Sequence, residues 1–429
     1  MSSVVQRRFP RMGIEQLDQL ADAAVDLLEN DRKRALSPDS QKKLRPWTGP
    51  EVAALLKVSL DALYRRLKKE PSLPQGKQVT ERRREFTMDD IWILMEAFGI
   101  RPIRKPDDAT QVWSICMFKG GVSKTTLALN VSQGLCRRGL RGLLIDMDPQ
   151  ASATQGSGIS PLAVNDEDTI FPLLHGPEIP KNVPEEEVAA IEGEWVGSLV
   201  SAIRPTAWPN LDLLPASLAL FGGDFEVANR AVRLRGFPFH RILANALEEI
   251  KKSGKYDYIL FDTAPSLGFL NTIAIFAAEV LLVPVPPAPL DIHSAGMFFQ
   301  TLAETIKPLS AVEMSPKEFE AVLMLISKYK EGDKSHEELE AKLREKFKPI
   351  TLKSKLLLSA ALEKLGAKLL TPYETTGYQG GRRTLERVLE SLDSIADEVR
   401  DVMVNIWECR RSEASVPSAE EALASTGTQ

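Results

Sequence analysis

Residues 116–130, "CMFKGGVSKTTLALN", almost spell a phosphate-binding loop. The common form of that loop, G-x-x-x-x-G-K-[ST], places glycines six residues and one residue before its lysine. At these two positions the sequence has Phe118 and Ser123 instead. The stretch is therefore either a damaged loop or a loop of another kind, and the residues around it must decide.

The context of the loop favours phosphate binding. It follows an apolar run, "VWSICMF", and precedes a segment with helical character, so it lies where a strand feeds a helix N-terminus. Gly120 and Gly121 allow the backbone to approach a ligand closely, Lys124 would reach the β and γ phosphates, and Thr125 would ligate Mg²⁺. Candidate nucleotide-binding residues of the loop are Lys119, Gly120, Gly121, Val122, Ser123, Lys124, Thr125 and Thr126.

Two further motifs contain carboxylates at the ends of apolar runs. Asp146 and Asp148 follow "GLLI" and are two residues apart, so they face the same side of an extended strand end. Asp262 ends the run "YDYILF". Either motif alone is often only a helix cap, but together with the loop they indicate a nucleotide site.

The three stretches "KGGVSKTT", "LLIDMDPQASAT" and "YILFDTAPS" resemble the ParA/MinD family of deviant Walker ATPases over about residues 112–400. In that family's loop a first lysine replaces the first glycine as the signature, and Lys119 matches it. The resemblance implies that Lys119 reaches the phosphates of a partner subunit in an ATP-bound dimer, and that Lys119, Lys124 and Asp148 are catalytic. It further implies metal binding by Thr125, Asp146 and Asp262, and a nucleotide pocket that includes Pro287 and Asp291. Ser123 departs from the commonest form of the loop, which affects loop geometry and rate rather than binding.

The chain from Val112 onward has the pattern of an α/β fold. Six short apolar runs alternate with helix-length segments, which indicates buried parallel strands covered on both faces. We therefore expect a parallel-sheet P-loop NTPase domain at 112–405, after a Pro-containing linker at 101–111, and a disordered tail at 406–429 that begins near Trp407. The six runs are "VWSICMF", "RGLLIDMD", "NLDLLPAS", "YDYILFDTAP", "AEVLLVPVPP" and "EAVLMLISKY".

The N-terminal quarter of the chain differs in charge and pattern. Residues 1–105 hold 21 basic and 15 acidic residues, whereas the whole chain has a net charge of -5. Within 1–40 the spacing of Ile14, Leu17, Leu20 and Ala21 predicts an amphipathic helix, whose apolar stripe packs either on the same chain or on a second copy.

Residues 45–100 predict a winged helix-turn-helix. Thr48 and Ser59 are expected to cap two helices, "KQVTERRREFT" reads as two strands around a basic tip, and Thr87 is expected to cap a last helix. The basic residues gather on the second helix and the wing, which favours specific DNA binding over a merely solvated face. The candidate DNA-binding residues are Tyr64, Arg65, Arg66, Lys68, Lys69, Lys77, Arg82, Arg83 and Arg84. By resemblance, Lys353, Lys355, Arg382 and Arg383 are candidates for nonspecific DNA, although solvated charge is the commoner explanation for such residues.

These features predict a partition ATPase of the type Ia plasmid class. The resemblance implies ATP/ADP and Mg²⁺ as cofactors, a homodimer, specific and nonspecific DNA, and a ParB-like centromere-binding protein that stimulates weak ATP hydrolysis. Without an apolar run of about 18 residues or a signal peptide, a cytoplasmic, nucleoid-associated protein without a membrane partner is expected. A nucleotide-gated transcriptional regulator without a segregation role shares every motif and stays open. A membrane-cycling MinD-like protein would need a basic amphipathic helix at the C-terminus, which this sequence does not offer. An electron-transferring iron protein would need paired cluster cysteines, and the three cysteines here are far apart.

Overall fold

The computed structural model describes residues 12–35, 42–80, 83–179, 195–234 and 236–415, together with 183, 184, 187 and 191. Its centre is an eight-stranded sheet with the order β11-β10-β9-β4-β8-β5-β7-β6. All neighbouring pairs are parallel except β6 and β7. The strands are β4 (Gln111–Ile115), β5 (Gly142–Asp146), β6 (Arg204–Pro205), β7 (Leu211–Leu214), β8 (Tyr258–Asp262), β9 (Val280–Val285), β10 (Ala321–Tyr329) and β11 (Thr351–Leu357).

The six apolar runs form strands, and the predicted parallel α/β fold is confirmed. The central strands β4, β5, β8 and β9 are buried at every position, as expected of strands covered on both faces. Strand β11 was missed because it lies at the edge of the sheet, where only two of its seven residues are buried and two lysines interrupt the apolar pattern.

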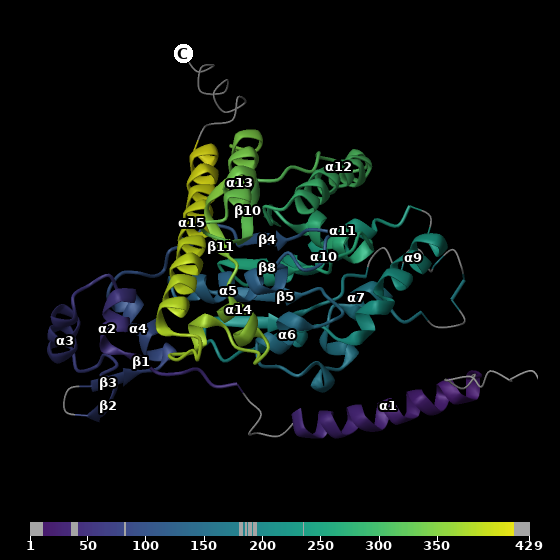
Figure 1. Ribbon diagram of the computed structural model, residues 1–429. Coiled ribbons are helices and arrows are strands. Elements are labelled where there is room, and N and C mark those ends of the chain that lie inside the picture. Colours follow the sequence, from purple (N-terminus) through teal and green to yellow (C-terminus); the bar gives the residue numbers. More distant parts are fainter. Residues whose placement is uncertain are drawn as a thin grey trace, which may run out of the picture.

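Helices cover both faces of the sheet (Figure 1). One core contains Trp113 and Ile115 with residues of α5 (Lys124–Cys136) and α15 (Arg382–Ala414). The other core contains Val112 with residues of the helices α10, α11 and α12. Alternate side chains of β4 thus point into different cores, as the two-residue period of a strand requires. The bounds are Ile242–Lys252 for α10, Phe269–Ala277 for α11 and Pro289–Ala311 for α12. The remaining described helices of this region are α6 (Ser152–Gly156), α7 (Phe171–His175), α9 (Gly223–Arg233), α13 (Lys334–Lys346) and α14 (Ala360–Gly366).

The prediction that 406–429 is a disordered tail is wrong for residues 406–414. They form the last turns of α15, where Trp407 is buried and its Nε1 donates a hydrogen bond of 2.8 Å to the Ala109 oxygen. The charged composition of this stretch was misleading, because Arg411 pairs with Asp108 at 2.7 Å and Arg410 pairs with Glu279 and Glu320. Residues 416–429 lie outside the described residues.

The N-terminal residues form a long helix and a smaller group of elements. Helix α1 (Ile14–Ala35) runs apart from the sheet (Figure 1), and its side chains at residues 14–24 are exposed. Then follow β1 (Trp47–Thr48), α2 (Gly49–Leu55), α3 (Leu60–Lys69), β2 (Lys77–Thr80), β3 (Arg83–Phe86) and α4 (Met88–Ala97). The three strands form one sheet in the order β1-β3-β2.

Local sequence explains the helix starts in this group, which we call the N-terminal module (residues 47–97). Ser59 accepts a hydrogen bond from the Ala62 amide at 3.2 Å, and Thr87 accepts one from the Asp90 amide at 3.1 Å. These are two of the three predicted N-caps. The hydroxyl of the third, Thr48, instead donates to the Glu51 carboxylate at 2.8 Å, which also accepts from the Thr48 amide. The module shares one hydrophobic core with α5, α15 and one face of the large sheet, so it is packed against the NTPase region rather than tethered to it.

Candidate nucleotide-binding site

The phosphate loop joins β4 to α5, and Lys124 is the first residue of that helix. Gly121 has φ +74°, and a Cβ added there would have no described atom within 4 Å. Ser123 also lies in the left-handed region, with φ 79° and ψ 27°, and its side chain does not cap the helix. The loop backbone therefore keeps at residue 123 a conformation that glycine adopts more easily, and the serine adopts it with strain.

Lys124 points back onto the loop. Its Nζ donates to the Lys119 oxygen at 3.1 Å, and the side chain is largely buried. Burial lowers the pKa of Lys124, although the Asp262 and Asp148 carboxylates oppose that shift. An ammonium group beside two carboxylates at a helix N-terminus is well placed to bind phosphate oxygens.

The other lysine of the loop is held by a carboxylate. Lys119 Nζ lies 2.7 Å from Oδ1 of Asp291, which belongs to the first turn of α12. The Lys119 side chain keeps about a third of its surface exposed. Asp291 was predicted to line the nucleotide pocket, and the structure places it against this lysine, while Pro287 is buried between β9 and α12.

Asp146 and Asp262 are direct neighbours at the carboxyl ends of β5 and β8. Asp146 accepts hydrogen bonds from the Thr154 amide and hydroxyl at 2.8 Å and from the Asp148 amide at 3.1 Å. Burial raises the pKa of Asp146 to about 6 in spite of these bonds. Asp146 therefore fixes the Asp148 and Thr154 backbone, which positions the loop that follows β5.

Asp262 is the exceptional group of the site. It is fully buried, and within the described residues neither of its oxygens accepts a hydrogen bond. Burial, and then the nearby Asp146 charge, raise the pKa of Asp262 well above its usual range. The Thr125 hydroxyl is close enough to the same carboxylate to oppose part of this rise in its pKa, although the geometry between the two groups does not meet that of a hydrogen bond. A buried carboxylate without a donor, next to a hydroxyl and the phosphate loop, fits a Mg²⁺ ion that takes its remaining ligands from phosphates and water.

Asp148 lies at the border between this buried pair and the surface. It is 9% exposed, and its Oδ1 accepts a hydrogen bond from the Gln150 amide at 2.9 Å. Gln150 in turn lines an open cavity of about 850 Å³. Asp148 is thus nearly buried beside a residue that lines this cavity, and its charge acts on Lys124 of the phosphate loop.

The comparisons with known proteins agree with this geometry. A family model described as an AAA domain matches residues 110–312. Protein SopA of Escherichia coli strain K12 is 29% identical over 385 residues, which cover 87% of this chain and 92% of SopA. The chromosome partitioning protein ParA of Caulobacter vibrioides strain NA1000 / CB15N is 35% identical over 178 residues, 41% of this chain and 55% of that protein. The P-loop domain of this chain is a ParA/MinD-like domain.

Similarity also extends beyond the ParA/MinD domain. A putative replication protein A of Sinorhizobium fredii strain NBRC 101917 / NGR234 is 28% identical over 383 residues, 86% of this chain and 89% of that protein. A solved structure titled "Partition Protein" superposes with a TM-score of 0.62 at 23% identity, covering 92% of this chain and 98% of the solved chain. At that identity the superposition shows the fold alone.

A cavity beside the phosphate loop involves residues that sequence reasoning missed. It measures about 230 Å³, and its lining includes Gly121, Ser123 and Thr126 of the ParA/MinD loop and helix. The opposite wall comes from the ends of β10 and β11, with Lys328 at φ 51° and Ser359 among its residues. The only signal in the sequence was Lys328, a charged residue near the end of the otherwise apolar run of β10.

The predicted DNA-binding residues of the N-terminal module fall into two groups. Arg65, Lys68, Lys69 and Lys77 are exposed. Others are engaged in the fold: Arg66 pairs with Glu70 at 3.1 Å and covers Phe98, Arg83 pairs with Glu85 at 2.7 Å, and Arg84 donates to the Gln75 oxygen at 3.0 Å and lies over the half-buried Tyr64 ring. Arg82 lies outside the described residues.

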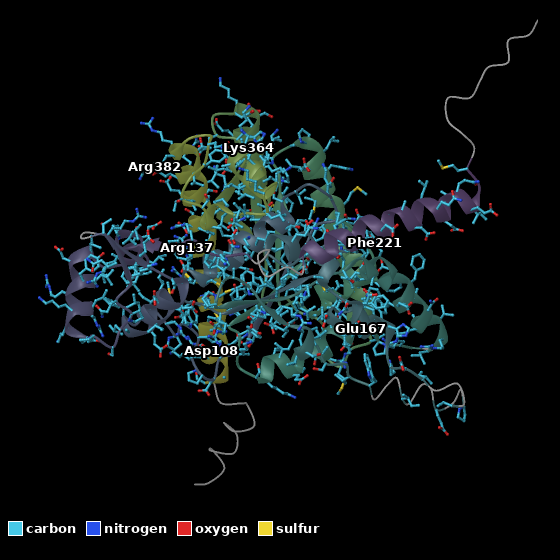
Figure 2. The ribbon with its side chains drawn as sticks, turned by 90° about the horizontal axis from the view of Figure 1, so that it is seen from below. Asp108, Arg137, Glu167, Phe221, Lys364 and Arg382 are labelled. Atoms are coloured by element: carbon cyan, nitrogen blue, oxygen red, sulfur yellow. The ribbon has the colours of Figure 1, made fainter. Side chains whose placement is uncertain are left out.

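The candidate residues for nonspecific DNA binding near the C-terminus also differ in exposure and in ion pairing. Lys355 is bound to Glu340 at 2.8 Å and lies over Tyr329. Lys353 and Arg383 are exposed, and Arg382 is almost fully exposed although it pairs with Glu386. Figure 2 shows that Arg382 projects from the same side of the molecule as Lys364. Among the described residues, no helix combines the length and the apolarity that a membrane span needs.

Proposed function

We propose that this protein is a DNA partition ATPase that dimerises on binding ATP. The observation that carries the proposal is the presence in one site of the signature lysine Lys119, which pairs with Asp291, and of the buried Asp262 carboxylate, which has no hydrogen-bond donor among the described residues. The first feature is typical of dimeric ParA/MinD enzymes, and the second requires a cation. Proteins named for chromosome partitioning are among the relatives, and SopA aligns along nearly its whole length.

Each residue of the site has a role in this proposal. Lys124 and the amides of residues 119–126 bind the phosphates, and the base enters the cavity lined by Lys328 and Ser359. Thr125 and Asp262 would hold Mg²⁺, and Asp146 fixes the backbone around them. When bound, the ion would supply positive charge beside the β and γ phosphates. Asp148 orients the attacking water. Lys119 exchanges Asp291 for the phosphates of the second subunit.

The two DNA activities are assigned to different surfaces. Specific operator binding falls to α3 and the wing of the N-terminal module, where Arg65, Lys68, Lys69 and Lys77 are exposed. Nonspecific binding in the ATP state falls to exposed basic residues near the start of α15, such as Arg382 and Arg383. The protein then represses its own promoter in one nucleotide state and binds the nucleoid in the other.

The experiment is ATP turnover by the full chain, measured alone, with nonspecific duplex DNA, and with DNA plus the product of the adjacent gene. We expect slow turnover alone and a severalfold increase with both additions, and no turnover for Lys124→Ala. Stimulation by neither addition, together with intact promoter binding, would instead favour the nucleotide-gated regulator.

A further inference from the structure

Glu374 is a buried carboxylate far from the phosphate loop in sequence that joins several parts of the chain. It ends the short helix η7 (Pro372–Glu374), and its side chain is about 2% exposed. Its Oε1 accepts hydrogen bonds from Gln133 Nε2 at 3.1 Å and Trp208 Nε1 at 3.2 Å, and its Oε2 accepts one from the Thr371 amide at 2.8 Å. The only positive charge that pairs with it among the described residues is Lys42, at 2.7 Å.

Lys42 connects this carboxylate to the N-terminal module. Its Nζ also donates to the Gly156 oxygen at 2.6 Å and to the Leu369 oxygen at 2.9 Å, so all three protons of the ammonium group are used. Five residues later, Trp47 opens the module and meets the Trp208 ring edge-on, at 5.9 Å between centroids. Because Trp208 itself donates to Glu374, the chain segment 42–47 contacts this carboxylate directly through Lys42 and indirectly through the Trp47–Trp208 ring contact.

The other side of the network reaches the nucleotide site. Gln133 lies on α5, the helix that begins with Lys124, and its Oε1 accepts a hydrogen bond from the Thr371 hydroxyl at 2.5 Å. Leu369 and Leu370 line a cavity of about 300 Å³ that is also lined by Thr125 and Thr126. Leu369 has φ 57°, which strains a non-glycine residue, and its carbonyl is the one that Lys42 binds.

The hydrogen bonds around Glu374 cannot easily be lost one at a time. A charged carboxylate that loses one of its donors inside the protein is left with an unsatisfied, desolvated charge, so the donors tend to keep or to change their arrangement together. A shift of α5 when phosphates bind at its N-terminus would move Gln133, and through Glu374 the segment 42–47. By linkage, the factor by which nucleotide changes the module's affinity for its ligand equals the factor by which that ligand changes the affinity for nucleotide.

We propose that the Lys42–Glu374 ion pair couples the nucleotide site to the N-terminal module, so that the state of the phosphate loop sets the position of α2 and α3. Lys42 and Glu374 are positioning residues and contact neither nucleotide nor DNA. This inference rests on the proposed function only in taking the ligand of the module to be operator DNA.

The test compares the coupling itself rather than either affinity. The Kd for a duplex that carries the chain's own promoter is measured with Mg²⁺–ADP and without nucleotide, for wild type, Lys42→Met, Lys42→Arg and a control, Lys251→Met. The control removes an ion pair with Glu248 at 3.0 Å and a longer one with Glu279 at 3.9 Å. We expect the ratio of the two Kd values to differ from one in wild type and in the control. It should approach one in Lys42→Met and be partly restored in Lys42→Arg, while each variant binds ADP within about threefold of wild type. A Lys42→Met protein that keeps the wild-type ratio would overturn the inference.

A second readout does not need the promoter. Hydrogen exchange of α2 and α3 amides is followed in the same four proteins with and without Mg²⁺–ADP. We expect ADP to change protection there in wild type and in Lys251→Met but not in Lys42→Met. If no protein binds the promoter yet ADP still changes exchange through Lys42, the operator role fails and the coupling stands. If ADP alters neither promoter affinity nor exchange in wild type, the coupling is refuted.

Discussion

Replacing Ser123 by glycine tests how much strain the phosphate loop stores. A non-glycine residue in the left-handed region costs about 1–2 kcal/mol, and Ser123 lies there at φ 79° without capping α5. Glycine removes this strain but adds conformational freedom to the unfolded chain, which costs about 0.4–1 kcal/mol. We therefore expect Ser123→Gly to stabilise the nucleotide-free protein by roughly 0–1.5 kcal/mol.

The chain offers a matched control for the same two contributions. Gly332, between β10 and α13, has φ +74°, and a Cβ there would have no described atom within 4 Å. Gly332→Ala adds strain without a clash, so it should destabilise by an amount similar to the gain in Ser123→Gly. Urea unfolding of both variants against wild type, without nucleotide, measures the two changes.

The sign of the two results decides the interpretation. A destabilised Ser123→Gly beside a destabilised Gly332→Ala would refute the reasoning, because the serine hydroxyl would then contribute more than its backbone strain costs. The affinity for ADP should change little in Ser123→Gly, since the amide of residue 123 keeps its direction in either residue. A large loss of ADP affinity would show that the hydroxyl itself binds the nucleotide.

Three other substitutions probe the charged groups of the site. Asp291→Asn should release Lys119 and speed ATP-dependent dimerisation, measured by light scattering. The control Asp107→Asn, at an exposed residue, should leave the rate unchanged. Equal rates in both variants would contradict the proposal that Asp291 holds Lys119 back from a second subunit. Asp262→Asn should raise the metal-free unfolding free energy by roughly 1–3 kcal/mol at pH 8. Because burial raises the folded-state pKa of Asp262, its protonated form stabilises the fold at low pH and that stability is lost as pH rises, so the gain should vanish below about pH 4; a gain independent of pH would exclude titration as its cause. Asp148→Ala should bind ATP but not hydrolyse it, and normal phosphate release would remove Asp148 from the catalytic residues.

The parts that were predictable from sequence depend on neighbours along the chain. The P-loop strand, the helix after it and the aspartates that end β5 and β8 follow from short apolar runs and the residues next to them. The N-caps Ser59 and Thr87 are equally local, since each bonds an amide three residues away. Such features need no knowledge of the tertiary fold.

The features that sequence reasoning missed depend on partners far away in the chain. The charged end of α15 is ordered because Arg411 meets Asp108, some 300 residues earlier. The Lys119–Asp291 pair could not be foreseen because both residues were expected to face the nucleotide. Lys42 carried no prediction from the sequence, and only its contact with Glu374 gives it a role.

The charges of the nucleotide site are balanced only in part, and this explains how one loop can serve as a switch. Lys119 has Asp291 as a partner, so it is satisfied before any nucleotide arrives. Asp262 has no donor among the described residues, so the site gains most from a ligand that brings a cation. In the proposed function, Mg²⁺–ATP would therefore bind one subunit first, through Lys124 and Asp262. The exchange of Lys119 from Asp291 to a second subunit would then be a separate step that replaces one ion pair by another, and a partner protein or DNA could control such an exchange with little free energy.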